Sequence, residues 1–552
     1  MKFRLLYIIF FIATVFTACK KLDRFPLDKP STETFYSNKT ELDLAVSALY
    51  NSALYPQDDE AWGDNYWQRT GNGNDIIHGT TTIQSGTFSN TWLTCYKGIA
   101  RANGILDNIN KAKDVTEDYR KQLEAQARFA RAYEYGILII HFGDVPFIKT
   151  TLTLDESKTV KRTAMAEIKQ FVYDELDAAA SILPVSYTTG NRYFTKGIVL
   201  SIKARIAISL NDWAVAADVA KKVMDMKVYA LYPSYRNLFL RAGQTSSEVI
   251  FSFPRSAAYN QTYDVQYTIS RNAGGFASNI PTIEIIDSYE CTDGKRIDQS
   301  PLYDYKHPFD NRDPRLKATI VPPGEVWLGY VFENNPDSTM VFSTKDNKRV
   351  ANKDARNASN AFASYTGYLW KKAIDETQVP QYNKVDLDNI VLRYAEILLI
   401  YAEAKTELNQ IDASVLEAIN MIRARAYGVA MTATTQYPAI TTVNQAELRK
   451  VIRRERRVEF VLEGLRYNDL LRWRLAEKVM NKKIIGVPLS KLDYPFPGMP
   501  VFDADDIPSY DALFSKVNIL DTRSFDPAKH YIWPVPFAEL SLNPDLGQNP
   551  NW

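Results

Sequence analysis

Apolar residues recur with the period of an α-helix in pairs of neighbouring segments, and this pattern constrains the fold more than any other feature of the chain. Each pair predicts two helices joined by a short turn. Such a hairpin buries its apolar face only by stacking on another hairpin. The pairs comprise residues 195–210 with 213–226, 392–408 with 415–426, and 445–462 with 465–480. We therefore expect a mainly α-helical fold.

The first pair spans about the 34 residues of a tetratricopeptide repeat. Ala204 and Ala207 are small where two helices must approach, and Asn211-Asp212 supplies a turn and a helix cap. Asp412 is expected to cap the second helix of the next pair. The same periodicity predicts further helices over residues 41–55, 92–109, 116–141 and 165–183.

The helical period is lost between residues 229 and 389, where Gly, Pro, Asn and Tyr dominate and β-branched runs are short. A loop-rich insertion of this length in a compact protein is usually functional, so we expect it to bind ligand. The predicted organisation is a single domain over 41–552, preceded by a signal peptide (1–18) and a lipid anchor with its tether (19–40). Its parts are a helical scaffold (91–228 and 390–480), the ligand-binding insertion (229–389) and a C-terminal irregular segment (481–552).

The first residues have the layout of a bacterial lipoprotein signal. Lys2 and Arg4 precede an apolar run over 5–15, and small residues stand directly before Cys19. The run is shorter than the roughly 20 residues that a membrane-spanning helix needs. We expect cleavage before Cys19, acylation of its thiol and attachment to a membrane. The alternative is an ordinary secretory cleavage site beside an incidental cysteine.

Several function classes lack their usual sequence devices. Loss of the signal's two cationic residues takes the formal charge from +1 to −1, and no basic tract is present, which argues against nucleic acid as a partner. The four histidines are far apart, and no GxSxG, Walker or GxGxxG motif occurs. No metal site, cofactor or catalytic residue is therefore predicted. Cys95 and Cys291 could form a disulfide or remain buried thiols.

Acidic residues at helical spacing could be mistaken for a catalytic row. Glu455, Glu459 and Glu463 share one helical stripe. Arg456 precedes Glu459 by three residues, and Arg466 follows Glu463 by three residues. We expect ion pairs on the helix surface, which lower carboxylate pKa values, whereas a general acid needs a raised one. The charged residues within 392–408, such as Arg393, Glu396 and Glu403, are expected to pair between repeats.

Aromatic residues make up 12% of the chain, with 33 tyrosines, and several lie in polar loops. A sugar ring stacks its apolar face on an aromatic side chain and exchanges hydrogen bonds with amide, guanidinium and carboxylate groups. The alternative is that Trp62 and Trp67 pack their loop onto the helices. The predicted ligand-binding residues are Trp62, Tyr66, Trp67, Arg69, Asn72, Asn74, Asp75, Tyr263, Tyr267, Arg271, Trp327 and Tyr368.

An ordered set of motifs resembles the SusD/RagB family of nutrient-binding outer-membrane lipoproteins. The resemblance runs from Cys19 to the C-terminus. The motifs are RFARAY (128–133), FGDVPF (142–147), RDPRL (312–316), LRYAEILLIYAEA (392–404), the arginine- and glutamate-rich block at 453–469, WPVP (533–536) and QNP (548–550).

This resemblance implies tetratricopeptide-like hairpins and capture of oligosaccharides without catalysis. It also implies a SusC-like, TonB-dependent outer-membrane transporter as partner, and an outer-membrane location facing the cell exterior. The family often has an acidic export signal after the lipidated cysteine, whereas Lys20-Lys21-Leu22-Asp23 is mostly basic here. A peptide-binding member of the family and a secreted glycosidase are the alternatives.

Overall fold

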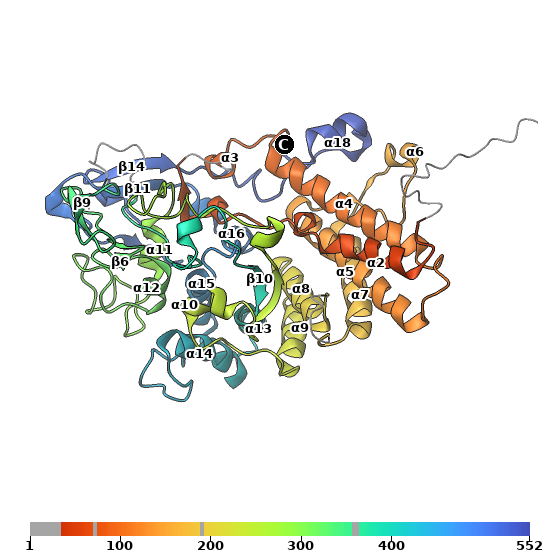
Figure 1. Cartoon of the computed structure of the whole chain (residues 1–552), viewed down its shortest axis with the longest axis horizontal. Helices are drawn as coiled ribbons and strands as arrows, with labels where there is room; N and C mark the ends of the chain where they lie inside the picture. Colours follow the sequence, from red (N-terminus) through yellow and green to blue (C-terminus); the bar gives the residue numbers. More distant parts are fainter. Residues whose placement is uncertain (1–34, 70–73, 188–192, 356–363) are drawn as a thin grey trace, which may run out of the picture.

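The structure is a computed structural model that describes residues 35–69, 74–187, 193–355 and 364–552 (Figure 1). The predicted signal peptide, Cys19, most of the tether and Asn72 lie outside the described residues. Among the residues that are described, no helix is both long enough and apolar enough to cross a membrane.

Antiparallel helices form the first half of the molecule, at the right of Figure 1. α4 packs on α5, α5 on α7, α7 on α8, and α8 on α9. Thr116 caps α5, because its hydroxyl accepts a hydrogen bond from the amide of Tyr119 (3.3 Å). The helices are α2 (Lys39–Ser47), α4 (Gly86–Asn108), α5 (Glu117–Phe142), α7 (Met165–Ile182), α8 (Lys196–Ser209) and α9 (Trp213–Asp225).

The hairpin α8–α9 stacks on a second hairpin formed by α13 (Tyr394–Glu407) and α14 (Ala413–Tyr427). This stacking confirms the predicted tetratricopeptide-like fold, and Asp412 caps α14 through the amide of Ser414 (2.9 Å). The predicted start of the helix at residue 392 is wrong. Residues 392 and 393 end strand β10 (Asn389–Arg393), which pairs with β4 (Val249–Phe253).

The third predicted hairpin is also irregular. α15 (Gln445–Glu459) ends three residues earlier than expected. The helix predicted over 465–480 consists of two short helices, α16 (Arg466–Arg472) and α17 (Ala476–Val479). Arg474, between them, has a φ of 55°, a left-handed conformation that cannot continue a right-handed helix.

The insertion contains the expected short strands, and the C-terminal segment contains strands as well. Within the described ranges, a four-stranded antiparallel sheet has the order β6-β7-β8-β9, and five two-stranded sheets accompany it. The remaining strands are β1 (Tyr66–Gln68), β2 (Val145–Pro146), β3 (Arg162–Thr163), β5 (Asn279–Pro281), β6 (Val326–Trp327), β7 (Tyr330–Val331), β8 (Met340–Ser343), β9 (Lys348–Ala351), β11 (Lys483–Pro488), β12 (Val501–Phe502), β13 (Pro508–Ser509) and β14 (Val517–Thr522). The short helices are α3 (Asn74–His78), α6 (Leu154–Ser157), α10 (Tyr235–Leu238), α11 (Ile283–Ser288), α12 (Arg315–Thr319) and α18 (Phe537–Leu542).

Two large hydrophobic cores lie side by side. One joins the helical hairpins, and the other joins the insertion to the C-terminal segment. α15 and the residues that follow it connect the two cores. Leu448 and Ile452 belong to the helical core, whereas Val458 and Val461 belong to the other.

A buried ionic network surrounds the end of α15. Arg393 donates to Glu248 (2.8 Å) and Glu459 (2.7 Å), and Arg315 donates to Glu459 (2.9 Å). Burial alone would raise the pKa of Glu459, but Arg425, Arg393 and Arg315 outweigh it and hold this pKa far below its ordinary value. The carboxylates of the stripe are ion-paired, but the predicted pairs on the helix surface are wrong, because the observed pairs are buried and reach other elements. No general acid is available at this carboxylate.

The residues expected to pair with the stripe within its own helix contact other carboxylates instead. Arg456 bonds to Asp469 (2.9 Å), and Arg466 bonds to Asp64 (2.7 Å). The arginines that contact the stripe come from distant parts of the chain, which periodicity along one helix cannot reveal. In agreement with the prediction, Glu396 of α13 pairs with Arg205 of α8 and so connects two hairpins.

Candidate functional site

Strand pairing brings the two predicted ligand-binding stretches together. β1 pairs antiparallel with β5, and the amide of Arg69 donates to the carbonyl of Ser278 (3.0 Å). The carbonyl of Tyr267 in turn accepts hydrogen bonds from the amides of Ser278 (2.9 Å) and Asn279 (3.0 Å). The N-terminal loop and the insertion therefore form one surface, although about two hundred residues separate them in sequence.

Five of the predicted ligand-binding aromatics lie in the core instead of at the surface, so protein covers their ring faces. Burial of their large apolar area stabilises the fold and explains this outcome. Trp62 packs edge-on against Tyr467 and Trp533, as the packing alternative expected. The five, with their exposed fractions, are Trp62 (8%), Tyr66 (9%), Trp67 (6%), Trp327 (1%) and Tyr368 (3%).

Three other predicted residues, Arg69, Tyr267 and Arg271, are exposed or partly exposed, as are Phe276 and Tyr365, which were not predicted; we call these five residues the loop surface. The guanidinium of Arg69 lies over the ring of Tyr365 (5.4 Å), and that of Arg271 lies 5.9 Å from the ring of Phe276. Tyr267, which is 47% exposed, contacts Phe276 with ring centroids 5.4 Å apart. Partial burial lowers the pKa of Arg69, and the like charge of Arg271 acts in the same direction.

Two carboxylates, one buried and one partly exposed, support this surface, and sequence reasoning missed both of them. Asp354 accepts hydrogen bonds from Ser270 (2.5 Å) and from the amide of Arg271 (2.8 Å), and burial raises its pKa. Asp521 of β14 contacts both Trp67 (3.2 Å) and His78 (2.8 Å). These residues lie far along the chain from the loops they support. No motif marked them.

The other predicted residues lie beside the loop surface or apart from it. Asp75 lies in the first turn of the short helix α3 and is partly buried. Asn74 starts the same helix. Tyr263 bridges to Val385, and one face of its ring is covered by the guanidinium of Arg255 (4.4 Å). Burial raises the pKa of Tyr263 to about 12.

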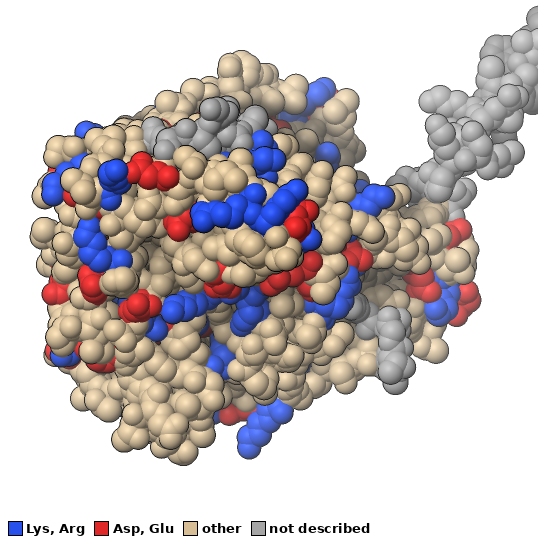
Figure 2. Space-filling view, turned by 60° about the vertical axis from the view of Figure 1, so that its left-hand side comes forward, with Lys and Arg blue, Asp and Glu red and all other residues tan. Residues whose placement is uncertain are grey.

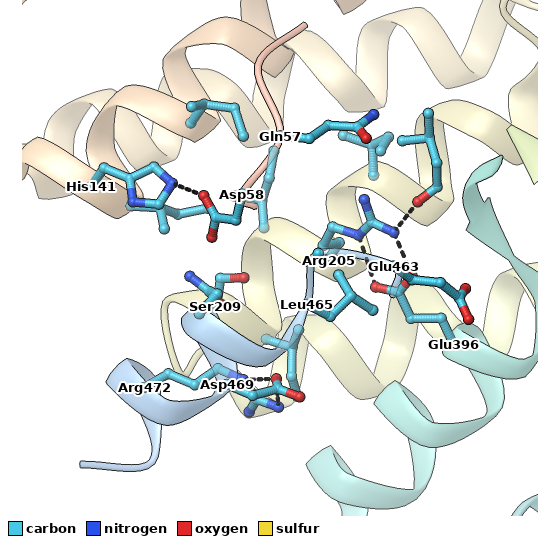
Figure 3. A pocket seen from close by; sticks show the side chains of 18 of the residues that line it. Gln57, Asp58, His141, Arg205, Ser209, Glu396, Glu463, Leu465, Asp469 and Arg472 are labelled. Carbon is cyan, nitrogen blue, oxygen red and sulfur yellow. Dashed lines mark hydrogen bonds and ion pairs between the residues drawn. The ribbon is translucent and has the colours of Figure 1, made fainter. Parts of the chain in front are cut away.

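A small pocket between α5, α8 and the segment around α16 contains several charged residues (Figure 3). His141 pairs with Asp58 (3.0 Å), and the guanidinium of Arg205 donates to Glu396 (2.8 Å). The volume of about 80 Å³ is well below the roughly 300–1,000 Å³ of a typical ligand pocket. A pocket of this size is too small for an oligosaccharide chain.

The described residues offer little support for other chemistries. They contain no group of three or more His, Cys, Asp or Glu side chains that could hold a metal ion. Cys95 and Cys291 are buried free thiols and not a disulfide. Figure 2 shows basic and acidic side chains next to one another across the face it presents, with no broad basic surface for a phosphate backbone.

Comparison with known proteins gives the family. Residues 247–552 match the family model described as "SusD family", and residues 32–208 match one described as "Starch-binding associating with outer membrane". The first match covers more than half of the chain, so this protein belongs to the SusD family, as its motifs indicated. The family is associated with the outer membrane.

Individual relatives agree with this assignment. The chain is 24% identical to SusD-like protein P25 of Formosa agariphila, over 84% of this chain and 88% of the relative. A SusD-like carbohydrate-binding protein of Bacteroides fragilis is 28% identical and superposes with a TM-score of 0.78, covering 93% of this chain and all of the other. A laminarin-binding SusD-like protein shares the fold (18% identical, TM-score 0.65, covering 94% of this chain and all of the other).

Proposed function

We propose that this protein captures an oligosaccharide at the loop surface without cleaving it. The observation that carries the proposal is the convergence of Arg69, Tyr267 and Tyr365, from separate parts of the chain, into one accessible surface of rings beside cationic donors. This combination suits a sugar, which offers an apolar face for stacking and hydroxyls for hydrogen bonds. Kinship with a carbohydrate-binding protein of Bacteroides fragilis supports the same ligand class.

Affinity electrophoresis over a panel of glycans and peptides tests this proposal. Tyr267→Ala and Arg69→Ala should each weaken retention by the bound glycan about tenfold, because each removes a contact worth about 1–2 kcal/mol. Tyr259→Ala is the matched control, since Tyr259 is 80% exposed but lies in the neighbouring turn and not on the loop surface. Retention by peptides alone would favour the peptide-binding alternative. New reducing ends after incubation would favour a glycosidase.

We also propose that Cys19 carries the lipid and that the protein delivers its ligand to a SusC-like, TonB-dependent outer-membrane transporter. The signal layout and the family's association with the outer membrane support this location. Cys19→Ala should move the protein from the membrane fraction to the soluble fraction. If the variant stays in the membrane fraction, the lipid anchor is wrong. Display on the outer face predicts that external protease digests the protein in intact cells.

A further inference from the structure

A second hollow, remote from the loop surface, lies between the N-terminal end of α8, the end of α2 with the turn that follows it, and β4. It has a volume of about 610 Å³, which is within the range of ligand-binding pockets. We call it the tyrosine groove. Its lining is Ser47, Tyr50, Val185, Ser186, Tyr187, Tyr193, Phe194, Thr195, Ile198, Tyr229, Gln244, Thr245, Ser246, Val249, Ile250, Phe251, Ser252, Phe253 and Pro254.

The lining of the tyrosine groove favours an uncharged ligand. Among the described residues, it contains no Asp, Glu, Lys or Arg, but it contains seven aromatic rings and many hydroxyl groups. Tyr193 is 37% exposed, and its ring contacts the rings of Tyr50 and Tyr187, with centroids 5.4 Å apart in both pairs. A charged ligand would lose its hydration here without gaining an opposite charge. An uncharged ligand with apolar faces and many hydroxyls needs no opposite charge, because the rings and hydroxyl groups of the lining can replace its contacts with water.

Two polar groups in the groove lack partners. Gln244 Nε2 and Ser246 Oγ are buried and make no hydrogen bond to any part of the chain that the structure describes. A buried polar atom left in this state destabilises the fold. Rotation of the two side chains toward the groove would let oxygen atoms of a ligand bind the amide and the hydroxyl.

The tyrosine groove also continues into a second hollow. Ser47, Tyr187 and Tyr193 line a neighbouring hollow of about 320 Å³ as well, so the two hollows form a trough. Lys39 and Asp43, the charged residues in this second part, pair with each other (2.7 Å) and so neutralise their charges. A linear chain of several units fits such a shape better than a single ring does.

We infer that the tyrosine groove is a second binding site, for a neutral oligosaccharide segment. The inference shares only the ligand class with the proposed function and concerns different residues. Tyr193 and Tyr229 would supply the stacking faces, and Gln244 and Ser246 the hydrogen bonds.

Isothermal titration of the full chain in detergent, with laminarihexaose and maltohexaose as probes, tests the site. Tyr193→Ala and Gln244→Leu should each weaken one binding step about tenfold, the equivalent of one lost contact. Gln244→Leu is the sharper variant. It keeps the volume and removes an unsatisfied amide, so it should retain or raise the thermal midpoint while it loses affinity.

The loop-surface variant Tyr267→Ala should leave that step unchanged, which separates the two sites. If Tyr193→Ala and Gln244→Leu bind as the unsubstituted chain does while Tyr267→Ala is weakened, this inference fails and the proposed function stands. If neither probe binds, or if no variant changes binding, the inference fails, and the glycan panel alone decides the proposed function. Competition by a synthetic peptide of residues 20–34 would show that the groove takes this chain's own tether, and would also overturn the inference.

Discussion

Arg393 has no exposed surface and donates hydrogen bonds to Glu248, Glu459 and Glu463. Its removal would leave each of these three carboxylates without one of its cationic partners. We therefore expect Arg393→Met to lower the free energy of unfolding by about 3–5 kcal/mol, the usual cost of breaking a buried ion pair from one side. Urea denaturation followed by circular dichroism measures this change.

Arg241→Met is the control for this variant. Arg241 also pairs with a carboxylate, Asp386, but its side chain is 53% exposed. Water screens such a pair, so the loss should stay below about 1 kcal/mol. Equal losses in Arg393→Met and Arg241→Met would contradict the idea that burial makes the network matter.

Glu290 belongs to the same ionic network and makes the stability of the fold depend on pH. Burial would raise its pKa, but Arg423 and Arg454 prevail and lower this pKa to about 2 from an ordinary value of 4.5. Because the folded pKa is the lower one, the stabilisation is complete above about pH 4.5 and is lost as the pH falls toward 2. It amounts to ~3 kcal/mol at 1.36 kcal/mol per unit.

The measurement for Glu290 is the free energy of unfolding at pH 6 and at pH 3 to 2. Glu290→Gln is expected to be less stable than the unsubstituted chain at pH 6 and to lose about 3 kcal/mol less on acidification. An unchanged pH dependence in this variant would assign the acid sensitivity to other carboxylates, such as Glu459.

Residue type alone predicted the chemistry of the loops but not the direction of each ring. Tyr267 and Trp67 both lie in polar stretches, yet one is 47% exposed and the other 6%. Which ring is buried depends on partners far along the chain, such as Asp521 for the indole of Trp67. Such distant partners cannot be predicted from the local sequence.

At the scale of elements, the ends of helices set the direction of the chain. Gly143 ends α5 with a φ of 71° and a ψ of −118°, a conformation nearly restricted to glycine. An added Cβ would also lie 2.7 Å from Ile532 Cδ1. We expect Gly143→Ala to cost about 2–3 kcal/mol in unfolding free energy, from strain and displacement of that side chain.

Gly428→Ala provides the comparison. Gly428 ends α14 in an ordinary left-handed conformation, with a φ of 67° and a ψ of 28°. A Cβ there would meet nothing within 4 Å among the described atoms. The expected cost is about 1 kcal/mol, from backbone strain alone. Thermal midpoints of the two variants measure the difference, and a larger loss in Gly428→Ala would refute this account of Gly143.

Helices with a clear 3.6-residue periodicity of apolar residues and a capping side chain could be predicted to within a residue or two. Thr195 and Asp412, for example, begin their helices as expected. The prediction failed where tertiary contacts decide the backbone. Residues 392–393 have a helical pattern but form a strand, because β4 supplies a pairing partner from the insertion. Arg474 interrupts a continuous pattern with a left-handed residue.

At the scale of the whole molecule, the two candidate ligand surfaces depend on different parts of one scaffold. The loop surface rests on the core of the insertion and the C-terminal segment, whereas the tyrosine groove rests on the helical core. Phe194 and Phe251, which line the groove, belong to the helical core. Either surface can keep its shape only while its own core stays folded.

The two cores should unfold together. α15 supplies Ile452 to one core and is followed by Val461 in the other, and the ionic network at Glu459 joins the insertion to the hairpins. Separation of the cores would expose this network as well as apolar area. We expect one calorimetric transition, with equal calorimetric and van't Hoff enthalpies. Glu459→Gln should weaken the connection and broaden or split that transition. Two transitions in the unsubstituted chain would contradict this view, because each core would then be stable without α15 as a common element.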